Sequence, residues 1–135
     1  MPLLDWNHTD FIECLEVLPK SEDVETEQVF SIQREGLALD VSVWPLESVV
    51  YLDLHRVESE QSLIGMALFV RGPVEFIKEK NIECLRFHNA IPVPNRFSYM
   101  DFEEDLHDPD AISYGLTAVL RVNPDIVIEF ENGID

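Results

Sequence analysis

The sequence predicts a mainly β protein, either an antiparallel β-sandwich or a partly open barrel of seven to eight short strands, with one short N-terminal helix. From Gln28 onward, apolar and polar residues alternate with period two, the spacing of a half-buried strand. Turn signals separate these runs roughly every 8 to 12 residues. The clearest helical stripe lies near the N-terminus. The alternative is an α+β fold with a helix packed on one face of an antiparallel sheet.

The size of the chain favours one domain spanning residues 1–135. With 135 residues and 46% hydrophobic content, it is long enough to bury roughly two thirds of its unfolded surface around a single core. We find no internal repeat and no linker between domains.

The N-terminal helix is predicted from a cap and a stripe. Asn7 or Thr9 is suited to cap it, and Pro19 is expected to stop it. One helical face would carry Phe11, Ile12, Leu15 and Leu18. A strand over residues 12–18 is the competing interpretation, because apolar residues also alternate there.

Strands are predicted over residues 28–33, 37–44 and 49–57. The first two would form a hairpin through Glu35 and Gly36, and a turn over Pro45 to Ser48 precedes the third. Residues 63–72 are apolar on both faces and are predicted to form a central strand. Residues 73–81 would form either one helical turn or an edge strand.

The C-terminal third is predicted as three strands and a long loop. Residues 81–90 alternate, and Pro92 and Pro94 are expected to break regular pairing, so that a loop runs from Ala90 to about Ile112. Strands over residues 115–122 and 125–130 would be joined by a turn at Asn123, Pro124 and Asp125.

Charge limits the classes of partner. The chain carries 27 acidic and 9 basic residues, for a formal net charge of -18. Nucleic acid and anionic membranes are therefore disfavoured, whereas a positively charged protein would be attracted. The chain has neither a signal-peptide pattern at its start nor an apolar run long enough for a membrane span, so we expect a cytoplasmic protein. The two cysteines, Cys14 and Cys84, are expected to be buried and reduced.

The densest charge lies between Asp101 and Asp110, in the sequence DFEEDLHDPD. The leading hypothesis is a non-enzymatic binding or inhibitory protein whose acidic segment docks a basic protein, with nearby aromatic residues as apolar anchors. In composition the chain resembles bacterial immunity proteins, which are often small and acidic. The expected partner-binding residues are Phe97, Tyr99, Asp101, Phe102, Glu103, Glu104, Asp105, Asp108 and Asp110. The segment lacks the glycine of an EF-hand loop, and we expect no metal or cofactor; a weak, non-EF Ca²⁺ or Mg²⁺ site in it is the alternative.

Two other hypotheses remain open. If strands 49–57 and 82–88 were neighbours, a polar cluster on the sheet face could serve an enzyme or a metal-dependent module. That cluster would contain Tyr51, Asp53, His55, Arg86 and His88. No nucleophile motif or phosphate-binding loop supports catalysis. Alternatively, the apolar terminal strand could pair with a second copy and form a homodimer.

Overall fold

The computed structural model describes residues 4–20, 27–79, 81–93 and 116–132. Within these residues the chain forms one α-helix, α1 (His8–Leu15), and eight antiparallel strands. The strands are β1 (Gln28–Arg34), β2 (Leu37–Trp44), β3 (Val49–Arg56), β4 (Ser62–Val70), β5 (Val74–Glu79), β6 (Ile82–Val93), β7 (Leu116–Arg121) and β8 (Val127–Asn132). The prediction of a mainly β fold with one short helix is confirmed.

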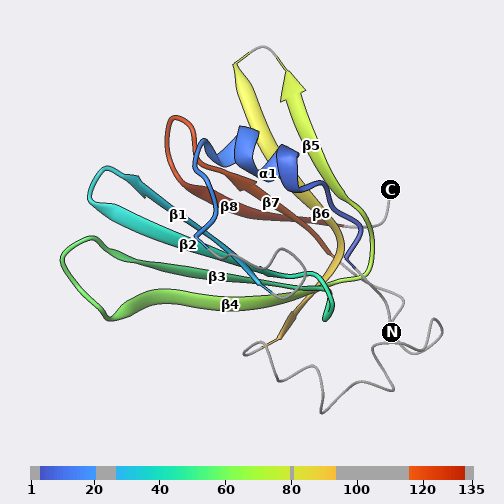
Figure 1. The fold of residues 1–135 in the computed structure, drawn as a ribbon, viewed down its shortest axis with the longest axis horizontal. Helices are drawn as coiled ribbons and strands as arrows, with labels where there is room; N and C mark the ends of the chain where they lie inside the picture. The colour runs from blue at the N-terminus through green and yellow to red at the C-terminus, as the bar shows by residue number, and fades with distance from the viewer. Residues whose placement is uncertain (1–3, 21–26, 80, 94–115, 133–135) are drawn as a thin grey trace.

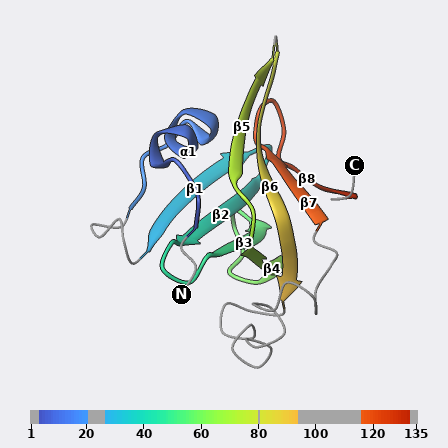
Figure 2. The ribbon, with the colours of Figure 1, turned by 90° about the vertical axis from the view of Figure 1, so that its right-hand side faces the viewer.

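All eight strands belong to one sheet that is not closed (Figure 1). Its order is β1-β2-β3-β4-β6-β7-β8, and β5 pairs with β6 beside this path. The long strand β6 joins two halves because residues 82–87 pair with β5 and residues 90–93 pair with β4. The sheet consequently bends, and β5 to β8 rise out of the layer formed by β1 to β4 (Figure 2).

The bend between β4 and β5 requires a glycine. The Gly72 N–H donates to the carbonyl oxygen of His88 at 2.9 Å. A Cβ at Gly72 would lie 2.7 Å from that same oxygen, too close for any other residue without a backbone shift. Gly72 thus lets the chain turn from one half of the sheet into the other against the side of β6.

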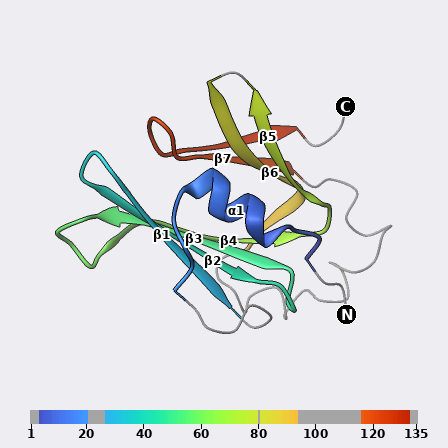
Figure 3. The ribbon, with the colours of Figure 1, turned by 45° about the horizontal axis from the view of Figure 1, so that its top comes forward.

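The concave face of the sheet holds the core and is covered by α1 (Figure 3). The Phe11 ring is fully buried and lies 5.6 Å from the ring of Phe30 in β1 and 6.0 Å from that of Phe87 in β6, measured between centroids. Alternation along the strands supplies the facing residues, among them Leu39, Val41 and Leu52. The helix therefore packs against both halves, as the α+β alternative anticipated.

The ends of α1 differ partly from the prediction. Asn7 is the N-cap, and its side-chain oxygen accepts a hydrogen bond from the Thr9 N–H at 2.9 Å. The helix ends earlier than Pro19, because Glu16 adopts the left-handed conformation with φ 59 and donates its N–H to Ile12. Leu18 is consequently outside the helix and 75% exposed. The helical prediction is confirmed, and the competing strand over residues 12–18 is wrong.

The strand predictions hold with one correction. Residues 74–79 form an edge strand, which excludes the helical turn, and β4 lies inside the sheet between β3 and β6. The predicted break at Pro92 is wrong, because β6 continues to Val93 and pairs Pro92 with Leu68. In the described residues, pairing of β6 with β7 reaches only Ala90, so the missing N–H of Pro92 costs no bond on that side.

Polar contacts join segments that are distant in sequence. The guanidinium of Arg34, at the end of β1, donates through Nε and Nη2 to Asn123 Oδ1, at 3.3 and 3.1 Å. Arg34 also lies 3.9 Å from a carboxylate oxygen of Glu16 at the end of α1. The first strand is thereby tied to the β7–β8 connection.

In the described ranges, no helix is both long and apolar enough to cross a membrane.

Candidate functional site

The acidic segment predicted to bind a partner lies outside the described residues. This includes every residue from Phe97 to Asp110 that was expected to contact a basic protein. Its role as a docking surface stays a prediction, and the structural description of candidate sites rests on the sheet.

The outer face of β2 and β3 carries a polar cluster. Strand alternation turns Leu39 and Leu52 toward α1 and places Asp40, Asp53 and His55 on the opposite face. The β2–β3 turn pairs Trp44 with Val49, which brings Asp40 directly opposite Asp53. Two carboxylates thus share adjacent positions on one face of the sheet.

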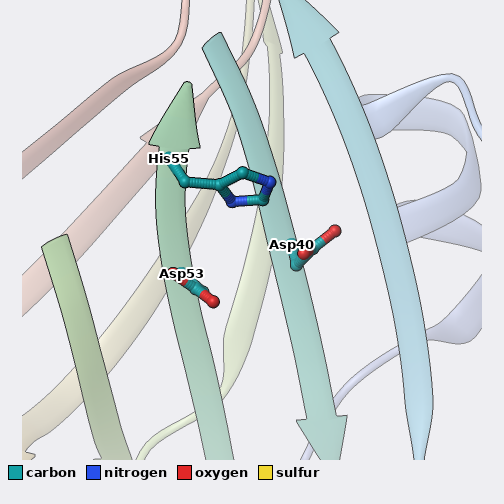
Figure 4. Close-up of side chains that lie close together, drawn as sticks. All are labelled: Asp40, Asp53 and His55. Carbon is teal, nitrogen blue, oxygen red and sulfur yellow. The ribbon is translucent and has the colours of Figure 1, made fainter. Parts of the chain in front are cut away.

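The three side chains lie close together, and the Asp40 carboxylate points toward β1 (Figure 4). One ligand-type atom from each of Asp40, Asp53 and His55 lies within 4.8 Å of the other two, and all three residues are half-buried. His55 reaches from β3 over β2, and the Asp53 carboxylate points toward the same strand. Ser31 Oγ donates to Asp40 Oδ1 at 2.6 Å, and Ser62 Oγ donates to Asp53 Oδ1 at 2.7 Å.

Asp40 was not among the site residues predicted from the sequence. The missing step was register: a turn over Pro45 to Ser48 that pairs Trp44 with Val49 necessarily pairs Asp40 with Asp53. The signal was therefore present in the length of the turn. Asp53 and His55 were expected to be candidate residues, and the structure brings these two together.

The predicted five-residue polar cluster does not form. Its premise was that residues 49–57 and 82–88 are neighbouring strands, but β3 pairs with β2 and β4, whereas β6 pairs with β4, β5 and β7. Arg86 instead forms an ion pair with Glu131 of β8. His88 Nε2 lies 2.9 Å from Glu75 Oε1 of β5. Strand order, which alternation does not encode, separates the two groups.

Tyr51 lies beside the Asp40, Asp53 and His55 group but faces a different neighbour. Its hydroxyl lies over Gly65, where an added Cβ would approach it to 2.8 Å. The ring packs with a small apolar cluster on the outer face that includes Val49, Ala67 and Phe69. Tyr51 therefore covers the sheet beside the acidic pair.

One pocket in the described part of the chain is open and lies at the bend. It is lined by Pro73, Val74, Glu75 and His88. The His88 and Glu75 side chains are held together at its wall, and both are partly exposed. This arrangement presents a histidine and a carboxylate to solvent.

The cysteines are buried and free, as predicted. Burial raises the pKa of the Cys14 thiol to about 12, and burial likewise raises the pKa of Cys84. A catalytic cysteine requires a lowered pKa, so that the thiolate is present near neutral pH. Both residues therefore act as packing groups.

Comparison with known proteins finds a similar fold but no matching family. No protein-family model matches the chain, and no curated protein matches it. Among solved structures, the fold matches a chain with a TM-score of 0.68, covering 98% of this chain and 99% of the other at 12% identity. That chain belongs to a contact-dependent growth inhibition toxin–immunity protein complex from Klebsiella pneumoniae 342. At this identity the likeness shows a shared fold over the whole length of both chains.

Proposed function

We propose that this chain is an immunity-type protein that binds and neutralises a basic protein toxin. The observation that carries the proposal is the fold match over 98% of this chain to a chain from a toxin–immunity protein complex. The match includes nearly the whole of that chain, so the resemblance does not rest on a shared fragment.

Charge supports the immunity role and a basic partner. The formal net charge is -18, and potentials of opposite sign speed association and disfavour wrong partners. In the described part, three of the basic residues are already engaged by acidic neighbours: Arg34 by Glu16, Lys78 by Glu13 and Glu83, and Arg86 by Glu131. These contacts leave the acidic excess to dominate the field around the molecule.

The proposed docking surface is the segment from Phe97 to Asp110. Its carboxylates would attract the basic partner, and its three aromatic residues would supply buried anchors at the contact. The anchors are Phe97, Tyr99 and Phe102, and the carboxylates are Asp101, Glu103, Glu104, Asp105, Asp108 and Asp110. We propose a cytoplasmic location, which suits two free thiols.

The decisive experiment uses the protein encoded by the reading frame next to this one. We expect it to arrest bacterial growth when expressed alone, and co-expression of this chain to relieve the arrest. Isothermal titration should show a one-to-one complex whose affinity falls as salt is added. A neighbouring protein that is harmless and does not bind would contradict the proposal.

Two variants with equal charge change locate the docking surface. In the segment variant, the six carboxylates between Asp101 and Asp110 become Asn or Gln. In the sheet variant, the same change is made at six exposed residues elsewhere: Glu35, Glu58, Glu60, Glu79, Asp125 and Glu129. We expect the segment variant to lose at least about 100-fold in affinity, as loss of hot-spot contacts does. An equal loss in both variants would show that only the overall charge matters.

A homodimer is the second hypothesis, and one observation favours testing it. The terminal strand β8 is an edge of the sheet, and its Phe130 is 40% exposed. Uncovered edges tend to pair with another strand. If the protein acts as a monomer that binds a toxin, size-exclusion chromatography with light scattering should give the monomer mass. A dimer abolished by Phe130→Glu would instead support pairing through this edge.

A further inference from the structure

The two carboxylates on the outer face form a like-charge pair. Asp40 and Asp53 are directly opposite in the β2–β3 register, and side chains at such positions lie about 4.5–5.5 Å apart at Cβ. Like charges placed directly opposite each other destabilise a sheet. A nearby positive charge would therefore stabilise the arrangement.

The described residues do not supply one from Lys or Arg. The ion pairs of Arg34, Lys78 and Arg86 do not involve Asp40 or Asp53. The hydrogen bonds that the two carboxylates accept come from the neutral hydroxyls of Ser31 and Ser62. A cation bound between the two carboxylates would relieve their repulsion.

The third member of the group indicates which cation. His55 adds an imidazole nitrogen to two carboxylate oxygens, so the donor set is mixed rather than purely acidic. Calcium and magnesium prefer oxygen ligands, whereas imidazole suits zinc and its transition-metal neighbours. We propose that Asp40, Asp53 and His55 bind a divalent transition-metal ion of the zinc type.

The geometry supports a three-ligand site. Ligands bind zinc at about 2.0–2.2 Å in a tetrahedral arrangement, so donor atoms around one ion lie about 3.3–3.6 Å apart. The observed group lies within 4.8 Å, so rotations of the half-buried side chains would have to bring the donor atoms closer together. Water or a group from a partner would fill the remaining position, as in zinc sites with three protein ligands.

The sheet also holds the ligands in place. Each carboxylate already has one oxygen fixed by a serine hydroxyl, the kind of support that orients metal ligands in known sites. The β3–β4 register shifts between Leu54 and His55, and such irregularities re-aim the side chains beside them. Both features are properties of the folded sheet and need no partner protein.

Titration calorimetry with metal-free protein tests the inference, with Zn²⁺, Mn²⁺, Mg²⁺ and Ca²⁺ as separate probes. We expect saturable one-to-one binding of Zn²⁺ that EDTA reverses, and weaker binding of Mg²⁺ and Ca²⁺. Ser31→Ala and Ser62→Ala should each weaken Zn²⁺ binding about 10- to 100-fold. Co²⁺ should give a visible absorption spectrum that distinguishes imidazole coordination from loose ion pairing.

Ligand variants provide the sharpest control. Asp40→Asn and His55→Gln should abolish Zn²⁺ binding, and Asp40→Asn should keep or raise thermal stability without metal because it removes the repulsion. His88→Gln is the matched control, since His88 also lies beside a carboxylate on the sheet surface; it should bind Zn²⁺ normally. Absence of saturable binding by the wild type would overturn the inference, as would binding that survives both ligand variants or disappears in His88→Gln.

The result is separable from the proposed function. If metal binding is absent but Asp40→Asn weakens the complex with the toxin, the acidic pair contacts a cationic side chain of the partner and the metal inference is wrong. If Zn²⁺ binds while no toxin does, the metal site stands and the proposed function fails.

Discussion

At the scale of single residues, Phe11 has the most concentrated packing role. Its fully buried ring contacts Trp6 beside the helix, Phe30 in β1 and Phe87 in β6. Truncating it would leave a cavity where the helix meets both halves of the sheet. This makes Phe11 the residue at which helix packing is best tested.

Phe11→Ala is expected to lower the free energy of unfolding by about 3–5 kcal/mol, the usual cost of deleting a buried aromatic ring. Urea titration followed by circular dichroism measures the change. Leu18→Ala is the control, since Leu18 is 75% exposed and should change stability by less than about 0.5 kcal/mol. Equal effects from the two substitutions would contradict the observed packing of α1.

Cys14 predicts a pH dependence at the same scale. Burial raises the pKa of its thiol from 9.0 to about 12. Between these values the unfolded chain loses a proton that the folded chain keeps, so stability is unaffected below about pH 9 and falls as pH rises above it. Each pH unit in this window costs about 1.4 kcal/mol.

Urea titrations at pH 8 and pH 10.5 on the wild type and on Cys14→Ala isolate this contribution. Other groups also titrate in this range, so the test is the difference between the two proteins. The wild type should lose more stability than Cys14→Ala over the same interval. Parallel losses would show that the thiol ionises equally well in the folded protein.

At the scale of elements, Arg34 joins the beginning and the end of the sheet. Its two hydrogen bonds to Asn123 tie β1 to the β7–β8 connection, although β1 and β8 are not paired. The Arg34 side chain is only 24% exposed, so these bonds are partly shielded from water. The contact limits how far the open sheet can splay.

Arg34→Gln is expected to destabilise the fold by about 1.5–3 kcal/mol, the range for hydrogen bonds to a charged group. Asn123→Ala should cost a similar amount, and the double variant should cost less than the sum because both remove the same contact. Arg56→Gln, at the exposed end of β3, is the control. Strict additivity of the first two would show that Arg34 and Asn123 act independently.

At the scale of the whole molecule, the net charge of -18 acts on folding as well as on binding. Mutual repulsion among carboxylates destabilises the compact state, and salt screens it over a Debye length of about 10 Å at 0.1 M. We expect the thermal midpoint to rise as NaCl is raised from about 0.01 M to about 0.3 M.

The sheet variant that neutralises Glu35, Glu58, Glu60, Glu79, Asp125 and Glu129 gives the internal comparison. With less charge to screen, its midpoint should shift less over the same salt range. An identical shift would mean that the salt acts through a general solvent effect and not through the charge of the protein.

Much of the fold could be predicted because short-range residue patterns indicate the strands and the helix. Period-two alternation located the strands, and of the two predicted caps, Asn7 and Thr9, it is Asn7 that caps the helix. The predictions of two element ends were wrong: the end of the helix and the end of β6. The helix ends at Glu16 because this residue adopts the left-handed backbone conformation. Pro92 remains in β6 because β6 pairs with β4 on one side.

The sequence by itself determined the class of the protein: a small, strongly acidic, mainly β protein. Composition and alternation carry that information because charge and side-chain face are properties of residues and their spacing. Only the tertiary structure decided which residues meet. Strand order separated His55 from His88, since it depends on contacts between segments far apart in the chain, and the β2–β3 register joined Asp40 to Asp53.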